Sequence, residues 1–337
     1  MYRETPQNST HSASSEHDVL SYARHDVFTD SDHLSAAVRH LNLELVQRVP
    51  GPFHGDLYSG TLEGTMVQFI HLNQPTISRA INAPDRLAVL IQLRGSEPCI
   101  WNGYESQGSS LITYGPGHEH FGSEPREFEC AFVSIPLERI DLLMERDHEA
   151  AVGRLRTGCH HLHAPAVGFV EIEKQLTQLQ AVIESKPILL THAAVRQMFE
   201  YSLEESLLSI IRKAEHRLLL SQDSTDRQTS GQIIRRTEQF LESHPDQPIQ
   251  LMQLCSAIGV KPPELGRAFR ELLNIEPKRY LRLYRLHCVR RILLAADPSE
   301  TSIEFVARNW GFWSRLQFEA EYRRIFGELP SQTLARQ

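Results

Sequence analysis

Basic side chains that could contact the phosphates and base edges of a nucleic acid are concentrated in the last third of the chain. Residues 231–337 contain 16 Lys and Arg against 12 Asp and Glu, whereas the rest of the chain contains 19 against 30. The formal net charge of −7 therefore conceals a mildly basic segment attached to an acidic body. Because such a balance is common on protein surfaces, the spacing of these residues has to decide what they do.

Residues 248–273 follow a helix–turn–helix pattern that would turn an arginine outward. Apolar residues at three- and four-residue spacing predict a short helix that ends at Gly259, since glycine reaches positive φ without steric cost. A second helix begins at two prolines and carries Leu265 and Phe269 on its predicted inner face. Arg267 lies opposite that face, where an arginine can reach guanine O6 and N7.

Residues 301–326 repeat the pattern about fifty positions later. Gly311 supplies the turn, Ser314 is predicted to cap the following helix, and Phe318 faces inward. A single arginine-rich helix over 277–296 is expected between the two patterns. Two such corners at this spacing are far more specific than one, because helical bundles contain many single corners.

Two carboxylates on the last of these helices need an explanation on a surface that would meet phosphates. Glu319 and Glu321 fall on the flanks of the helix, and we expect them to pair with Arg323 and Arg324 at i+4 and i+3 spacing. The alternative is that Glu319 accepts a hydrogen bond from a cytosine amino group.

Four motifs within residues 250–333 resemble a known family. They are Leu265-x-Arg267-x-Phe269, Pro277-x-x-Tyr280-Leu281-x-x-x-Arg285-Leu286, Ala307-x-x-x-Gly311-Phe312, and Phe318-x-x-x-Tyr322 with Phe326-Gly327-x-x-Pro330-Ser331. In combination they resemble the double helix–turn–helix DNA-binding domain of the AraC/XylS family of transcription regulators. Two departures from the family pattern are Asn274 in place of a glycine and Lys261 in place of a serine; Asn tolerates the left-handed conformation, so the fold is still expected.

The resemblance implies a sequence-specific transcription regulator, an activator rather than an enzyme, that reads two successive major grooves of double-stranded DNA. RNA polymerase, a small-molecule effector and a second copy of the chain are the implied partners, and no cofactor is expected. The predicted DNA contacts are Lys261, Glu264, Arg267, Arg270, Ser314, Arg315, Leu316, Gln317, Ala320 and Arg323.

The N-terminal half is predicted to be rich in β-strands, because short runs of β-forming residues alternate with Gly, Pro and Asn. The resulting fold class is α+β, with an antiparallel sandwich or barrel over roughly 44–135. The family resemblance, together with the likeness of residues 108–122 to a strand and turn of the family's cupin-like barrels, implies that this part is a cupin-like barrel that binds the effector, and that the helical segment after it dimerises. The expected segments are a disordered tail (1–30), the β-rich domain (31–164), the dimerisation helices (165–220), a polar linker (221–230) and the DNA-binding domain (231–337).

Three aromatic residues, Trp101, Tyr104 and Tyr114, are candidates for the effector site because their rings combine an apolar body with a polar tip. Packing within the sheet is an equally open role for each. Residues 51–64 and 310–334 also resemble the ethanolamine-operon activator branch of the family.

An alternative reading is a metal-dependent cupin enzyme fused to a DNA-binding domain. His118, His120 and Glu124 have a spacing at which two histidines and a carboxylate could hold a metal, with a further ligand from another strand, for which His160, His161 and His163 are candidates. The flanking Gly and Pro residues favour a turn for these histidines, so surface or packing roles are expected instead.

The sequence also indicates where in the cell the protein is expected to be found. No apolar run reaches the 18 to 20 residues that a membrane helix needs, and the polar N-terminus has no apolar signal region. The five cysteines are scattered without CxxC spacing, which favours reduced thiols in the cytoplasm. None lies in the Pro-Cys-His-Arg setting of the alkyl-transfer repair proteins that share this DNA-binding fold.

Overall fold

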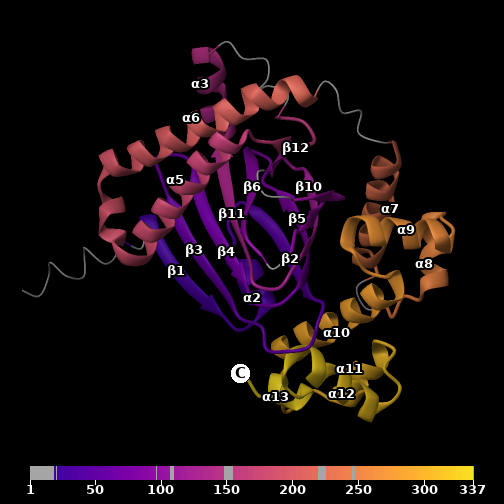
Figure 1. The fold of residues 1–337 in the computed structure, drawn as a ribbon. Coiled ribbons are helices and arrows are strands. Elements are labelled where there is room, and N and C mark those ends of the chain that lie inside the picture. Colours follow the sequence, from indigo (N-terminus) through magenta and orange to yellow (C-terminus); the bar gives the residue numbers. More distant parts are fainter. Residues whose placement is uncertain are drawn as a thin grey trace, which may run out of the picture.

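Four layers lie side by side in the computed structural model (Figure 1). They are a helical hairpin, a seven-stranded sheet, a five-stranded sheet and an all-helical C-terminal domain. The residues described are 19, 21–95, 97–106, 110–147, 155–218, 225–244 and 247–336.

The two sheets are antiparallel and pack face to face. The large sheet has the order β1 (Ala23–Phe28), β3 (Gly55–Thr61), β4 (Met66–Leu72), β11 (Phe128–Pro136), β6 (Arg86–Arg94), β9 (Ser110–Tyr114) and β12 (Cys159–His163). The small sheet has the order β2 (Leu41–Gln47), β5 (Thr76–Asn82), β10 (Glu119–Glu124), β7 (Ile100–Trp101) and β8 (Tyr104–Glu105). Apolar side chains between the sheets, among them Phe128 and Phe132, form one core cluster.

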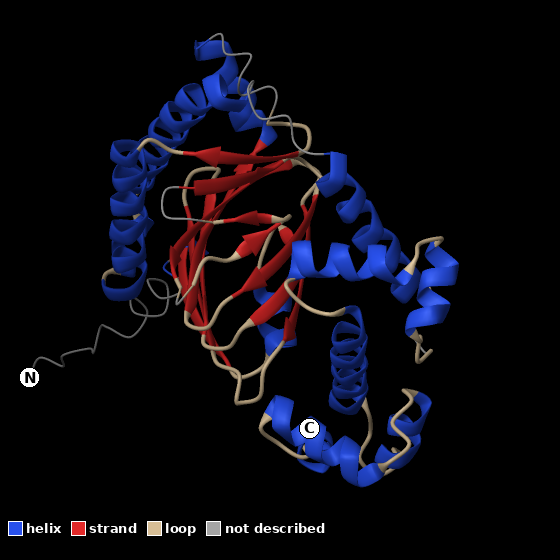
Figure 2. Ribbon diagram, turned by 45° about the vertical axis from the view of Figure 1, so that its right-hand side comes forward, coloured by secondary structure: helices blue, strands red, loops and turns tan. Residues whose placement is uncertain are grey.

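Helices cover the outer faces of both sheets (Figure 2). The N-terminal part contains α2 (Ser31–Ala37), α3 (Leu137–Asp147), α5 (Ala166–Ser185), the 3-10 helix η1 (Pro187–Thr191) and α6 (Ala193–Leu218). The C-terminal part contains α7 (Thr225–Glu242), α8 (Leu251–Ile258), α9 (Pro262–Leu273), α10 (Pro277–Ala295), α11 (Ile303–Asn309), α12 (Arg315–Phe326) and α13 (Pro330–Leu334). None of the described helices combines the length and apolar composition needed to cross a membrane.

The outer face of the large sheet is covered by α5 and α6. Side chains such as Ile172 and Leu176 of α5 and Leu203 of α6 share a buried cluster with Phe69 and Val133 of the sheet. Most apolar side chains of the two helices, which were expected to dimerise, are therefore used within the chain.

The outer face of the small sheet is covered by the C-terminal domain. Val46, Ile77 and Phe121 of the small sheet belong to the same buried cluster as Phe269 and Tyr322 of the C-terminal helices. Strand β10 shows how this face is used: Phe121 packs into that cluster, whereas His120 and Glu124 face the space between the sheets.

Several boundaries differ from the prediction. Strand β1 lies inside the stretch expected to be a disordered tail, of which residues 1–18 fall outside the described residues. The β-rich domain begins with a short helix, α2, which ends at Ala37, and β2 begins at Leu41. Helix α7 begins at Thr225, inside the predicted linker, of which residues 221–224 lie outside the described part. The α+β class is confirmed, while the closed cupin-like barrel stays a prediction.

Candidate nucleic-acid interface

The first helix–turn–helix consists of α8 and α9. Gly259 ends α8 with φ +70, the left-handed conformation that the sequence predicted for it. Pro262 occupies the first turn of α9, and Asn274 ends that helix with φ +48, so asparagine does take the place of the family's glycine. Leu265 and Phe269 are fully buried, which turns the opposite face of α9 to the outside.

The outer face of α9 carries the four residues predicted to contact DNA. Lys261, Glu264, Arg267 and Arg270 are all exposed. The carboxylate of Glu264 accepts a hydrogen bond from the backbone N–H of Lys261 at 2.8 Å, so this side chain closes the start of the helix. Arg270 forms an ion pair with Glu276 at 2.9 Å. Arg267, in the middle of the face, is the best placed of the four for a base edge.

The second helix–turn–helix consists of α11 and α12. The hydroxyl of Ser302 caps α11, and that of Ser314 accepts a hydrogen bond from the Gln317 backbone N–H at 3.4 Å at the start of α12. The Ser314 cap was predicted. Phe318 and Tyr322 are buried on the inner face of α12. The other predicted contacts on this helix are exposed: Ser314, Arg315, Leu316, Gln317, Ala320 and Arg323.

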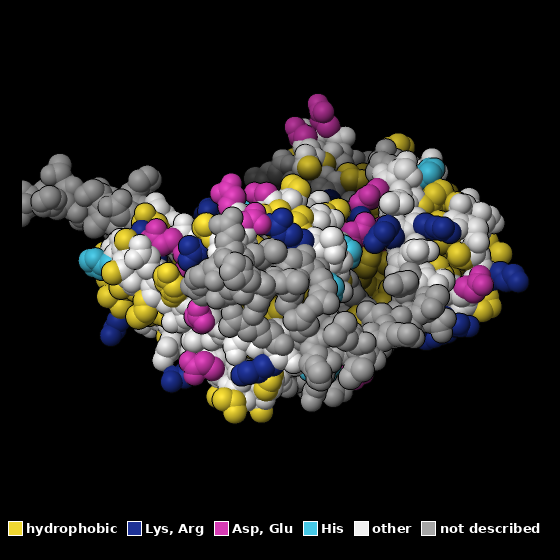
Figure 3. Space-filling view, turned by 90° about the horizontal axis from the view of Figure 1, so that it is seen from above, with side chains coloured by type: hydrophobic (Ala, Val, Ile, Leu, Met, Phe, Trp, Pro, Cys, Tyr) yellow, Lys and Arg dark blue, Asp and Glu magenta, His cyan; other side chains and the backbone are white. Residues whose placement is uncertain are grey.

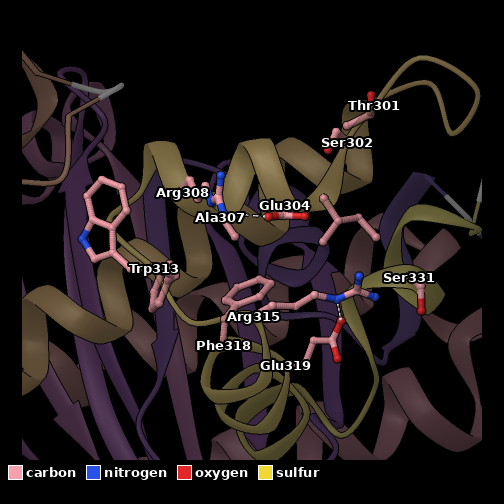
Figure 4. A pocket seen from close by; sticks show the side chains of 12 residues that line it. Thr301, Ser302, Glu304, Ala307, Arg308, Trp313, Arg315, Phe318, Glu319 and Ser331 are labelled. Atoms are coloured by element: carbon pink, nitrogen blue, oxygen red, sulfur yellow. Dashed lines mark hydrogen bonds and ion pairs between the residues drawn. The ribbon is translucent and has the colours of Figure 1, made fainter.

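The carboxylates of α12 do not pair as the sequence predicted. Glu319 binds Arg315, four residues earlier, at 2.8 Å, rather than Arg323 (Figure 4). Helical side chains lean toward the N-terminus, which favours this partner. Glu321 accepts two hydrogen bonds of 2.7 Å from Arg282 of α10 rather than pairing with Arg324. Glu319 therefore restrains an exposed arginine, whereas Glu321 joins α12 to the long helix.

Two exposed apolar residues lie at the start of α12, Leu316, which was predicted as a DNA contact, and Trp313, which was not. Trp313 is 78% exposed and Leu316 80% exposed. Trp313 lines a hollow of about 420 Å³ in the second helix–turn–helix, and Leu316 lies on the recognition helix α12. Figure 4 shows the Trp313 ring on the far side of that hollow from Glu319. Two consecutive aromatic residues, Phe312 and Trp313, could have indicated the exposed tryptophan in the sequence, since a tight turn can bury only one of them. Phe312 is the one that is buried.

Helix α10 connects the two helix–turn–helix units. Besides the Arg282 contact with α12, Arg285 donates to the backbone carbonyl of Ile249, just before α8, at 2.9 Å. Tyr280 and Leu286 are buried on its apolar stripe, as predicted. Arginines of α10 thus brace both units, so the density of basic residues in this helix reflects structure as well as charge.

The three candidate effector residues do not lie in one site. Trp101 and Tyr114 are each 1% exposed and lie between the sheets. The cavity beside Trp101 measures only about 40 Å³, room for little more than water. Tyr104 instead lines a crevice of about 370 Å³ together with Arg235 of α7 and Leu272 of α9. The crevice therefore lies where the β-rich part meets the C-terminal domain.

A buried hydrogen-bond chain occupies the space between the sheets. Tyr114 Oη lies 2.6 Å from His120 Nδ1, and His120 Nε2 lies 2.9 Å from Ser78 Oγ. Ser78 donates to Glu124 at 2.6 Å, and Thr76 donates to the other carboxylate oxygen at 2.9 Å. Burial lowers the pKa of His120 to about 3 and raises the pKa of Glu124. The imidazole is thus neutral, with one nitrogen donating and the other accepting.

The three residues of the metal alternative do not converge. His118 lines the outer crevice, whereas His120 and Glu124 face the interior. His120 lies in a strand and not, as predicted from the flanking Gly and Pro, in a turn. Within the part of the chain that the structure describes, no group of three His, Cys, Asp or Glu side chains is placed to hold a metal ion.

The chain is similar to several known proteins, above all in its C-terminal domain. Residues 254–336 match the family described as a helix-turn-helix domain. The probable thc operon regulatory protein of Rhodococcus erythropolis is 34% identical over 102 residues, which cover 30% of this chain and 31% of that protein. XylDLEGF operon transcriptional activator 3 of Pseudomonas putida is 28% identical over 247 residues, which cover 71% of this chain and 70% of that protein. The AraC-like transcriptional activator CuxR has a solved structure with 10% identity and a TM-score of 0.40, covering 85% of this chain and 98% of that one.

The domain match and the two exposed recognition helices define the class: this is a DNA-binding transcription regulator. Residues 254–336, which match the helix-turn-helix domain, contain both of these recognition helices.

Proposed function

We propose that both recognition helices, α9 and α12, enter successive major grooves on one face of the DNA. The observation that carries this proposal is that the two helices bury their inner faces in one domain and expose the predicted contact residues. The 19 residues of α10 between them span about 28 Å at 1.5 Å per residue. That length is close to the roughly 34 Å between successive major grooves.

The two helices would read DNA by different chemistry. Arg267 supplies a bidentate donor for guanine on α9, whereas Leu316 and Trp313 offer apolar surface at the start of α12, suited to thymine methyl groups. Lys261 and Arg323 are suited to phosphates, which contribute affinity but no sequence information. Acidic and basic side chains intermingle on the face seen in Figure 3, so the acidic body does not present one negative field there.

Replacing Arg267 with Ala tests the proposal. We expect the variant to lose about 1–3 kcal/mol of binding free energy on its selected DNA site and to relax the preference at one base pair. Arg308→Ala is the matched control, because Arg308 is also exposed but pairs with Glu304 at 2.9 Å. Equal losses on selected and random DNA would reduce Arg267 to a phosphate contact and contradict base readout by α9.

We also propose that the protein activates transcription together with RNA polymerase. Support comes from the matched Pseudomonas putida relative, which is named as a transcriptional activator. The likeness of residues 51–64 and 310–334 to the ethanolamine-operon activator branch further suggests control of genes for a small amine. Mapping bound sites across the genome, with transcript levels in a deletion strain, tests both ideas; bound genes that rise on deletion would contradict activation.

The crevice beside Tyr104 is the proposed effector site. Its volume of about 370 Å³ lies in the range of small-molecule pockets, and its walls come from both halves of the chain. Arg235 and Glu119 form an ion pair of 2.8 Å inside it, which favours a small polar ligand. Metabolites of the regulated pathway should raise the melting temperature of the full chain but not of Tyr104→Ala. An equal rise in both proteins would place the effector elsewhere.

Homodimerisation through the helices over 165–220 remains part of the proposal. Although α5 and α6 pack on the large sheet, Met198 and Tyr201 of α6 and Ile188 of η1 stay exposed. These three residues are the proposed dimer patch. A stable interface buries about 800 Å² on each partner, which is more than three side chains provide, so neighbouring side chains have to contribute the remaining area.

A further inference from the structure

One short segment of the β-rich part contacts the C-terminal ends of both recognition helices. Segment 47–51 begins at Gln47, the last residue of β2, and continues into the loop after it. Nη1 of Arg48 lies 3.4 Å from the backbone carbonyl oxygen of Asn274, the residue that ends α9. The backbone N–H of Gly51 donates to the carbonyl of Arg324, in the last turn of α12, at 3.2 Å. A single turn of chain thus joins two helices that lie in different helix–turn–helix units.

Gln47 fixes this segment against α12. Its buried side-chain amide donates to the carbonyl oxygens of Ile325 at 2.8 Å, of Val49 at 2.8 Å and of Gly51 at 2.7 Å. The last carbonyls of a helix have no partner within the helix, so they are available to an outside donor. Here the outside donor comes from the other half of the protein.

Further contacts hold the segment and the C-terminal domain together. Arg279, in the first turn of α10, donates to the carbonyl of Arg48 at 3.0 Å. Arg290 of α10 is buried and forms ion pairs with Asp30, which caps α2, and with Glu328, which follows α12. Because a buried charge that loses its partner is costly, these pairs favour one docked arrangement.

These contacts are made at the C-terminal ends of the recognition helices. Lys261 and Arg267 of α9 and Leu316 of α12, in the N-terminal halves of the two helices, remain exposed. In helix–turn–helix proteins the N-terminal residues of the recognition helix contact the bases. The docked β-rich part therefore leaves the reading surfaces open while it holds the opposite helix ends.

We propose that segment 47–51 sets the separation of α9 and α12 and thereby selects the number of base pairs between the two halves of the DNA site. Gln47 and Arg48 are the positioning residues, although neither belongs to the DNA-binding domain. The inference rests on the proposed function, because it requires both helices to engage DNA. One added base pair moves a half-site by about 3.4 Å along the axis, which a held pair of helices cannot follow.

The test uses the full chain and DNA duplexes that the wild type selects from a random-sequence pool. Duplexes with one or two base pairs inserted between the half-sites are compared with the parent duplex at one salt concentration. We expect the wild type to bind the lengthened duplexes at least about tenfold more weakly. Gln47→Ala should reduce that ratio by about fivefold, the effect of losing roughly one buried hydrogen bond, and Arg48→Ala should reduce it by a smaller factor.

Gln68→Ala is the matched control. Gln68 is also a buried glutamine of the β-rich part, but its side chain contacts Arg39 and Ser59 and no recognition helix. The control should keep the wild-type ratio. Arg48→Ala removes a surface contact, so it folds even if Gln47→Ala does not.

Three results would overturn the inference. Unchanged ratios in both variants would show that the segment does not set the spacing, although two-groove binding would stand. An equally reduced ratio in Gln68→Ala would indicate general loosening of the fold. A wild type that binds its selected DNA but ignores the inserted base pairs would remove the two-groove proposal together with this inference.

Discussion

At the scale of single residues, one ion pair dominates the exposed face of α12. Arg315 and Glu319 are joined at 2.8 Å, and the arginine side chain is 71% exposed. An exposed pair of this kind adds little to the stability of the fold. We expect its larger effect on DNA binding, since in the proposed complex the carboxylate holds a cation that would otherwise contact a phosphate and adds a negative charge near the DNA.

Glu319→Gln should therefore strengthen binding to DNA of any sequence. Releasing Arg315 to a phosphate should steepen the slope of log affinity against log salt by about 0.9. Titrations of a random duplex at several salt concentrations measure this slope. Glu321→Gln is the control, because Glu321 binds Arg282 within the domain. An unchanged slope in Glu319→Gln would show that Arg315 does not reach the DNA backbone.

At the scale of helices and strands, the outcome of the sequence predictions depended on where each element packs. The helix–turn–helix units were predictable because their apolar residues recur at helical spacing and their turns need Gly259, Asn274 or Gly311. Their caps at Ser302 and Ser314 follow from the same local rules.

The histidines of β10 were predicted to lie in a turn, because in β10, as in the neighbouring β5, the usual placing of polar and apolar side chains is reversed. The interior side chains include Ser78 and Glu124, while Ile77 and Phe121 point outward into the C-terminal domain. A sequence pattern assumes that the outward face meets water, and here it meets another domain. The contacts of segment 47–51 were unpredictable for a related reason, since they join residues more than 200 positions apart.

Helices α5 and α6 give the prediction for assembly. We expect the full chain to sediment as a dimer at micromolar concentration and Met198→Glu as a monomer, because a charge in the patch of Ile188, Met198 and Tyr201 would be buried without a partner. Val167→Glu is the control: Val167 is 84% exposed, at the start of α5, and is not part of the patch. A monomeric wild type, or an equal effect of both substitutions, would contradict the dimer patch.

At the scale of the whole molecule, the β-rich part and the C-terminal domain meet through buried charge. Glu238 of α7 accepts a hydrogen bond of 2.5 Å from the Tyr280 hydroxyl and lies 3.7 Å from Arg79 of β5. Burial raises the pKa of Glu238 to about 7, opposed by Tyr280 and Arg79, while Glu44 and Glu242 add to the rise. The native carboxyl therefore holds its proton at a pH where the unfolded chain has released it.

This shift predicts how stability depends on pH. Between the ordinary value near 4.5 and the native value near 7, the native state binds more protons than the unfolded state, so stability falls as pH rises. Glu238→Gln removes this contribution and should gain melting temperature over the wild type at pH 8 but not at pH 4. Melting curves across this range provide the measurement; parallel curves for the two proteins would contradict the shift.

The alternation along β10 has a consequence for how such genes can change. Successive residues of this strand serve two different surfaces, with His120 and Glu124 between the sheets and Phe121 in the cluster shared with the C-terminal domain. Losing one codon from the preceding turn would shift the strand by one residue and exchange the two sets, since side chains alternate with a period of two. Both surfaces would fail in one mutational step. Length changes should therefore be purged from this turn in descendants of the gene, while substitutions at its exposed positions accumulate.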